Sequence, residues 1–267
     1  MKFRPQKRFG QNFLKDKNIA RKIVSLIELP SPLLVVEIGP GKGVLTEFLL
    51  PVCEKYIGVE IDNILVQNLR EQYGANPNFT VIQQDILDVD LGEFILQYPE
   101  HSFAVIGNIP YNITSPILFK LFEKADMIHQ AVLMVQKEVA ERITAKPGSK
   151  AYGVISIFSQ VFAHVRYSFT VPAKLFYPAP KVDSAVLHFC FRKNVTAQFP
   201  DFELFSNTIR CCFRYRRKML RNSLSVLFSK EVLRKLEDPL TRRPEDLTID
   251  EWRILVDKIH TLLKKDS

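Results

Sequence analysis

Strand-length apolar segments alternate with helix-forming segments over the first half of the chain. The strand-like segments are residues 33–39, 55–61, 79–85, 102–108 and 130–136, and most of them are followed by apolar residues at helical spacing. They are nearly continuous apolar runs, as expected of parallel strands that are covered on both faces. The alternation therefore predicts a doubly wound, Rossmann-like α/β sheet, whose ligands bind at the carboxyl ends of the strands.

The second half of the chain changes in style. Two strand-like segments, 165–171 and 184–192, are joined by the Pro-rich stretch 172–183 without a helix between them, which predicts an antiparallel hairpin at the sheet edge. From about residue 202 the sequence is helical throughout, with one long helical stretch over 202–228. We therefore expect residues 1–195 to form an α/β domain with a basic N-terminal arm, and residues 196–267 to form a small all-α domain.

Charge favours a polyanionic partner. The formal net charge is +8 and the sequence pI about 9.3, and the basic residues crowd into the first 22 positions and into 210–221. No apolar run approaches the roughly 18 residues of a membrane span, and the charged first residues lack the apolar stretch of a secretory signal, so we expect a cytoplasmic protein. The four cysteines show no metal-ligand spacing, so neither a metal site nor a disulfide framework is expected.

A glycine-rich turn follows the first strand. Gly39, Gly41 and Gly43 can adopt positive φ there and let the backbone approach a nucleotide closely. Glu60 ends the next strand, about 20 residues beyond the turn, where a carboxylate can accept hydrogen bonds from ribose hydroxyls. Asp85 ends the third strand and either extends this pocket towards an adenine or caps a helix. These residues indicate an adenosine-containing cofactor and leave NAD and S-adenosylmethionine open.

The fourth strand ends on the tetrapeptide Asn108, Ile109, Pro110 and Tyr111. The exocyclic amine of adenine is a poor nucleophile because its lone pair is conjugated into the ring. The Asn108 side-chain oxygen and a main-chain carbonyl at Ile109 or Pro110 can accept its two hydrogens, while Pro110 stiffens the backbone that aims them. Tyr111 offers a face on which the base can stack. The tetrapeptide therefore predicts methylation of an adenine amine.

Six segments carry a resemblance to a known family. Residues 108–111 resemble motif IV of adenine amino-methyltransferases, and "EIGPGKGVLT" resembles their cofactor motif. "FYPAPKVDSAV" and "QKRFGQNFLKDKNIARKI" are similar to segments of the ribosomal RNA adenine dimethyltransferases, and "FRYRRKMLRNSL" and "RRPEDLTIDEW" resemble the branch of that family that acts on the small subunit.

The resemblance implies a specific activity and site. The expected reaction is S-adenosylmethionine-dependent dimethylation of two adjacent adenosines in the 3′-terminal hairpin of small-subunit rRNA, in the assembling subunit, without a metal and without an obligate protein partner. It implies a catalytic role for Phe176, which would stack on the target base opposite Tyr111. The residues that it implies for cofactor binding are Asn12, Leu14, Gly39, Gly41, Glu60, Asp85 and Asn108.

The basic C-terminal stretch is the expected RNA-binding surface. Its members would hold phosphates that flank the target loop: Arg214, Arg216, Arg217, Lys218 and Arg221. Four other functions remain open at this point: methylation of DNA adenine, methylation of the large subunit, a non-catalytic role in ribosome assembly, and an NAD-dependent dehydrogenase. The dehydrogenase would need a proton donor at the strand ends, and none of the five histidines lies there.

Overall fold

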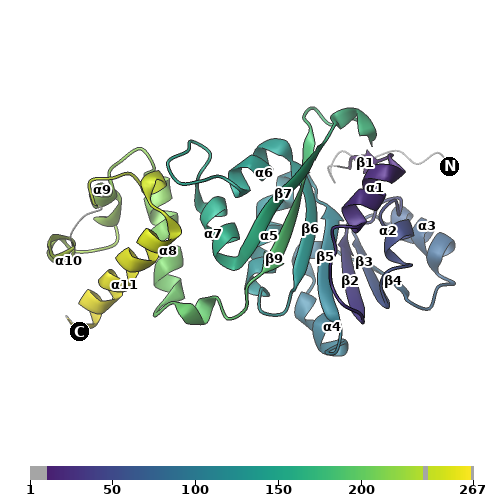
Figure 1. Ribbon diagram of the computed structural model, residues 1–267, viewed down its shortest axis with the longest axis horizontal. Helices are drawn as coiled ribbons and strands as arrows, with labels where there is room; N and C mark the ends of the chain where they lie inside the picture. Colours follow the sequence, from purple (N-terminus) through teal and green to yellow (C-terminus); the bar gives the residue numbers. More distant parts are fainter. Residues whose placement is uncertain (1–10, 237–239, 266–267) are drawn as a thin grey trace. The chain divides into compact units, whose positions relative to one another are not determined.

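The computed structural model describes residues 11–236 and 240–265, and the chain divides into two compact units (Figure 1). Unit 1 comprises the chain up to Ala140 together with Phe162–Lys193, and unit 2 comprises Glu141–Val161 and the chain from Asn194 onward. Most of the basic N-terminal arm, including Lys2, Arg4, Lys7 and Arg8, lies outside the described residues.

Unit 1 is built on one seven-stranded sheet with the strand order β4-β3-β2-β5-β6-β9-β7 (Figure 1). The five strands β4, β3, β2, β5 and β6 are parallel, and β9 and β7 form the antiparallel edge hairpin expected from the sequence. The bounds are β2 (Leu33–Ile38), β3 (Lys55–Glu60), β4 (Phe79–Gln83), β5 (Ser102–Asn108), β6 (Gln130–Gln136), β7 (Ala163–Val171) and β9 (Ser184–Phe191). The strand order reverses between β2 and β5, so a ligand crevice is expected at their carboxyl ends.

Helices cover both faces of this sheet. One face packs against α1 (Lys17–Val24) and α2 (Thr46–Leu49) through a buried cluster that includes Ile23 and Leu49. On the same face, Val66 of α3 (Asn63–Tyr73) packs against Val81 of β4, and Phe79 of this strand contacts both groups of residues. The remaining helices of this part of the chain are α4 (Leu91–Gln97), α5 (Thr114–Glu123), α6 (Lys137–Ile143) and the short 3-10 helices η2 (Ile86–Asp88), η3 (Tyr111–Ile113) and η4 (Ala173–Leu175).

A second, two-stranded sheet was not expected from the sequence. It pairs β1 (Phe13–Leu14) with β8 (Phe176–Tyr177) in antiparallel register, with Phe13 opposite Tyr177 and Leu14 opposite Phe176. The backbone N–H of Lys15 adds a hydrogen bond of 2.9 Å to the carbonyl of Leu175. This sheet joins the N-terminal segment to the Pro-rich segment 172–183, which are far apart in the sequence.

Unit 2 has an aromatic core. Phe205 packs against Phe199 with ring centroids 4.6 Å apart, and Phe158 lies 6.3 Å from both Phe202 and Phe205. Its elements are α7 (Val154–Phe162), η5 (Thr196–Gln198), α8 (Phe202–Arg214), α9 (Leu220–Leu224), α10 (Lys230–Lys235), η6 (Pro244–Asp246) and α11 (Ile249–Lys265). Because Phe158 packs into this core, residues 141–161 belong to the helical unit, whereas we expected them in the α/β domain.

The helical stretch expected over residues 202–228 is interrupted. α8 ends at Arg214 and α9 begins at Leu220. The N–H groups of Leu220 and Arg221 donate to the carbonyls of Arg242 and Leu240, at 2.8 and 3.0 Å, instead of to carbonyls four residues back. These long-range hydrogen bonds take the place of helical ones, and the local sequence gives no indication of them.

No helix among the described residues is long and apolar enough to cross a membrane.

Candidate active site

The glycine turn lies at the carboxyl end of β2 and has the geometry that glycine requires. Gly39 and Gly41 have φ of +63° and +60°. A Cβ atom added at Gly39 would meet no heavy atom within 4 Å, because this glycine borders an open cavity. At Gly41 the added Cβ would lie 3.0 Å from the ring of Phe13. The turn therefore presents bare backbone to the cavity, as close approach to a nucleotide requires.

Two carboxylates follow the next two strands. Glu60 is only 5% exposed, and its two oxygens accept the N–H groups of Gly41 and Asp62, each at 3.0 Å. Burial raises the pKa of Glu60, and these backbone hydrogen bonds oppose the rise. Asp85 accepts the N–H of Leu87 at 2.9 Å and so caps η2, while it also lines the cavity. The two alternatives for Asp85, cap and pocket residue, are therefore compatible.

Asn108 ends β5 with its side chain held in one orientation. Its Nδ2 donates to the main-chain carbonyl of Asn12 at 2.7 Å. A carbonyl can only accept, so this contact assigns the amide nitrogen and the amide oxygen of Asn108. The oxygen remains as an acceptor beside the cavity that Asn108 lines. Asn12 thus acts here through its backbone, across 96 residues of sequence.

The residues after Asn108 form a tight turn. The carbonyl of Pro110 accepts the N–H of Ile113 at 3.1 Å and the hydroxyl of Thr114 at 3.5 Å. Among the described residues no donor is bonded to the carbonyl of Ile109, whose own N–H is bonded to β6. The hydroxyl of Tyr111 is 2.8 Å from that of Ser184 on β9, and burial raises the pKa of Tyr111. The Tyr111 ring is therefore fixed at the cavity wall.

The structure gathers most of the residues expected at the site around a single cavity at the carboxyl ends of β2 to β5. Those that line it are Asn12, Gly39, Gly41, Glu60, Asp85, Asn108, Pro110 and Tyr111. Leu14 lies apart from them, 6% exposed, and lines a smaller cavity next to the glycine turn.

Phe176 is not among the residues that line this cavity. It is 2% exposed and packs in the apolar cluster of unit 1 with Leu14 and Met134. The reason is strand geometry: neighbouring side chains of β8 point to opposite faces, and Phe176 takes the core face. Its neighbours Leu14 and Met134 line the smaller cavity together with Asn108, and the stacking role that the resemblance implies for Phe176 stays a prediction.

Other residues at the site were missed by sequence reasoning. Gln11 and Phe13 line the cavity, and Ser184 anchors Tyr111. Ser184 is the last residue of the Pro-rich motif, and this position was the only sequence feature that could have indicated its role at the site. Phe13 could be found only from the pairing of β1 with β8.

A buried polar cluster supports the glycine turn from below. Oε2 of Glu37, in β2, accepts hydrogen bonds from the hydroxyls of Thr46 and Tyr56, both at 2.7 Å. Burial raises the pKa of Glu37 to about 7, against the opposing effect of these two hydrogen bonds. These hydrogen bonds connect β2, α2 and β3 at a position two residues before Gly39, the first glycine of the turn.

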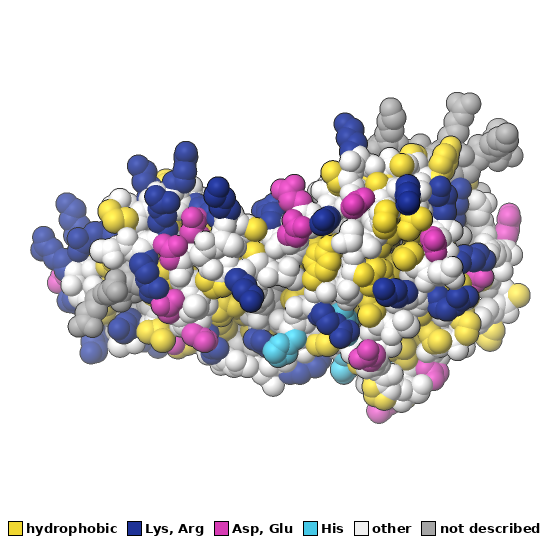
Figure 2. Space-filling view, turned by 45° about the horizontal axis from the view of Figure 1, so that its top comes forward, with side chains coloured by type: hydrophobic (Ala, Val, Ile, Leu, Met, Phe, Trp, Pro, Cys, Tyr) yellow, Lys and Arg dark blue, Asp and Glu magenta, His cyan; other side chains and the backbone are white. Residues whose placement is uncertain are grey.

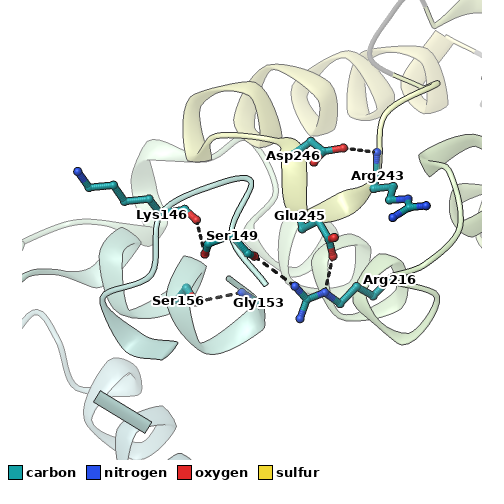
Figure 3. A network of polar contacts seen from close by, with 8 residues as sticks. All are labelled: Lys146, Ser149, Gly153, Ser156, Arg216, Arg243, Glu245 and Asp246. Carbon is teal, nitrogen blue, oxygen red and sulfur yellow. Dashed lines mark hydrogen bonds and ion pairs between the residues drawn. The ribbon is translucent and has the colours of Figure 1, made fainter. Parts of the chain in front are cut away.

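In unit 2 the expected RNA-binding residues divide into two groups. Arg216 is half-buried, and its guanidinium donates to the carboxylate of Glu245 and to the carbonyl of Ser149 (Figure 3). The carbonyl of Glu245 also accepts the N–H of Gly148 at 2.7 Å. Arg216 thus holds the loop around Ser149 against η6. The others are exposed, and they are Arg214, Arg217, Lys218 and Arg221.

Together these features define a class of protein. The doubly wound sheet has a glycine turn after its first parallel strand and a buried glutamate at the end of its second, which together form a site for an adenosine-containing cofactor. An oriented amide at the end of the fourth parallel strand lies beside this site and can orient an amine. This is the arrangement of a Rossmann-like adenine methyltransferase.

Comparison with known proteins gives the family: residues 2–259 match the profile of the ribosomal RNA adenine dimethylases, and the chain belongs to that family. The chain is 43% identical over 258 residues to "Ribosomal RNA small subunit methyltransferase A" of Chlorobium phaeobacteroides, covering 97% of this chain and 92% of that protein. It is 43% identical over 241 residues to the protein of the same name from Streptococcus gordonii, covering 89% and 83%.

Solved structures agree. A dimethyladenosine transferase from Plasmodium falciparum superposes with a TM-score of 0.81 at 28% identity, covering 95% of this chain and 98% of that one. The 23S rRNA methyltransferase ErmE superposes with a TM-score of 0.70 at 26% identity, covering 93% and 99%. The expected fold, the family and the enzyme class, an rRNA adenine dimethyltransferase that uses S-adenosylmethionine, are confirmed.

Proposed function

We propose that this protein dimethylates the exocyclic amines of two adjacent adenosines in the 3′-terminal hairpin of small-subunit rRNA, during assembly of the subunit in the cytoplasm. The names of the relatives favour the small subunit over the large one. The single observation that carries the proposal is the fixed amide of Asn108, because an adenosine-cofactor fold alone would need no oriented acceptor at the end of its fourth parallel strand.

The cavity residues fit S-adenosylmethionine. Each oxygen of Glu60 accepts one backbone N–H and retains a lone pair, so the carboxylate can accept both hydroxyls of a ribose. Ile61 and Ile86 supply apolar walls for an adenine, with Asp85 at its edge. The open space over Gly39 leaves room for the chain that carries the sulfonium. When bound, the cofactor supplies an electrophilic methyl group.

The strand end orients the nucleophile. The Asn108 oxygen accepts one hydrogen of the adenine amine, and the carbonyl of Ile109 accepts the other, because the carbonyl of Pro110 is already occupied by its own turn. Two acceptors on the amine hydrogens draw the lone pair out of conjugation with the ring. Holding the amine in line with the methyl group then supplies most of the rate enhancement. A neutral amide suits this orienting role and not that of a general base.

Tyr111 provides the platform for the base. Its ring lines the cavity and its hydroxyl is tied to Ser184, so the ring is held in place before the base arrives. The adenine must leave its stack to reach this position, which favours a hairpin loop over a duplex.

The exposed cations of unit 2 would hold the rest of the RNA. Arg214, Arg217, Lys218 and Arg221 lie at the surface, and the logarithm of RNA affinity should fall with the logarithm of salt concentration by nearly one unit for each phosphate neutralised. Arg216 is excluded from this set by its contacts with Glu245.

A labelling experiment tests the proposal. The protein is incubated with tritiated S-adenosylmethionine and unmethylated small subunits, with large subunits and duplex DNA in parallel, and the labelled nucleoside is identified after digestion. We expect dimethyladenosine from small subunits alone. Label in large subunits or in DNA would show that the substrate is not the small subunit. Tight RNA binding without label would mean a non-catalytic assembly role.

A further inference from the structure

The two residues of β8 have opposite environments. Phe176 is 2% exposed, whereas Tyr177 is 57% exposed, among the most exposed of the large apolar side chains. No described residue hydrogen-bonds the Tyr177 hydroxyl. A single exposed aromatic residue is ordinary on a protein surface, so its location decides whether it has a function.

The register of the small sheet gives that location. Tyr177 is directly opposite Phe13, and residues opposite each other in an antiparallel pair project from the same face of the sheet. Phe13 lines the active-site cavity, and its ring lies where a Cβ of Gly41 would be 3.0 Å away. Leu14 and Phe176 take the other face and are buried. Tyr177 therefore projects from the same face of the small sheet as Phe13, a residue of the cavity wall.

The segment that carries Tyr177 is anchored on both sides. The N–H of Lys15 donates to the carbonyl of Leu175 at 2.9 Å. At the far end, the carboxylate of Asp183 accepts the N–H of Ala173 at 2.9 Å, and its carbonyl accepts the N–H of Lys137 at 3.0 Å. The ring is thus presented by a braced turn, so little backbone ordering is needed when a ligand binds.

The charges around Tyr177 favour a nucleic acid. Lys15, Lys174 and Lys181 are exposed on the same two segments, and the carboxylate of the neighbouring Asp183 is already bonded to the backbone. Figure 2 shows hydrophobic side chains next to Lys and Arg on the face of unit 1 that carries β1 and β8. An exposed ring among cations is the combination that binds unstacked bases and their phosphates.

We infer that Tyr177 is a positioning residue that stacks on the nucleobase adjacent to the target adenine and so holds the opened loop over the cavity. The inference rests on the proposed function and extends it, because it assigns a second base site to the Pro-rich turn. Tyr111 receives the adenine that is methylated, and Tyr177 receives its neighbour in the loop.

The test compares three full-length variants, Tyr177→Ala, Tyr177→Phe and the control Tyr98→Ala, whose half-buried aromatic residue lies at the amino end of the sheet. Steady-state methylation of unmethylated small subunits gives KM and kcat. In parallel, a hairpin RNA with 2-aminopurine beside the target adenosine reports base stacking by its fluorescence. Affinity for S-adenosylmethionine is measured by calorimetry on every variant.

We expect Tyr177→Ala to raise KM about tenfold with kcat within about twofold, as loss of one stacked base implies. It should also abolish the fluorescence change, whereas Tyr177→Phe and Tyr98→Ala should behave as the wild type. Wild-type values for Tyr177→Ala in both assays would overturn the inference, and so would a loss of cofactor affinity. Failure of the wild type to label any subunit would instead refute the proposed function, while the fluorescence still tests Tyr177.

Discussion

Glu37 makes the stability of this protein depend on pH in a direction that the structure fixes. Burial raises the pKa of Glu37 from 4.5 to about 7, so the folded protein keeps the proton at pH values where the unfolded chain has lost it. Stability therefore falls as pH rises from about 4.5 to about 7 and stays low above that range. At about 1.4 kcal/mol per pKa unit, the full penalty is about 3 kcal/mol.

The substitution Glu37→Gln isolates this effect. The glutamine oxygen can accept the hydroxyls of Thr46 and Tyr56 as the carboxylate does, but it carries no charge at any pH. Urea unfolding of both proteins at pH 5 and pH 8 should show the wild type losing about 2–3 kcal/mol relative to the variant over this interval. The exposed Glu71→Gln should show no such change. The reasoning would be refuted if the difference in unfolding free energy between the wild type and Glu37→Gln were the same at both pH values, or if the wild type gained stability relative to the variant at pH 8.

Three further changes test other parts of the site. Gly41→Ala forces a Cβ to positive φ, 3.0 Å from an aromatic ring, and should weaken S-adenosylmethionine binding at least about tenfold by calorimetry, because the turn must shift. Arg217→Ala should lower RNA affinity, and should reduce the slope of log affinity against log salt concentration by about one unit, without changing the melting temperature. Arg216→Ala should instead lower the melting temperature, because it breaks the contact with Glu245. The reverse pattern would show that Arg216 binds RNA and Arg217 supports the fold. Ser184→Ala leaves the Tyr111 hydroxyl without its partner and should reduce single-turnover methylation about tenfold; an unchanged rate would show that this bond does not fix the ring.

The sheet and the strand-end residues could be predicted because they depend on local pattern. Continuous apolar strands, the glycines after β2 and the polar residue that ends each strand are all visible in short windows of sequence. Because ligands bind at the carboxyl ends of parallel strands, Glu60 and Asn108 were expected at the same edge of the sheet. In the structure both residues line one cavity.

What sequence reasoning missed depends on contacts between distant segments. The bond from Asn108 to the carbonyl of Asn12 spans 96 residues, and the pairing of β1 with β8 spans more than 160. That pairing decides which of two adjacent aromatic residues is buried, so the motif pointed to Phe176 while the structure exposes Tyr177. In the same way Arg216 is identical in type to its neighbours and differs from them only by the contact with Glu245.

The most direct test of the account is the rate of methyl transfer in Asn108→Ala within a preformed complex. Cofactor and unmethylated small subunits are supplied at saturating concentration, and a single turnover is followed by quenched flow, with Asn63→Ala on the exposed start of α3 as the control. If the Asn108 amide orients the amine, its loss should slow transfer by about 100-fold or more while subunit affinity stays within about threefold. Transfer at the wild-type rate would contradict the central claim.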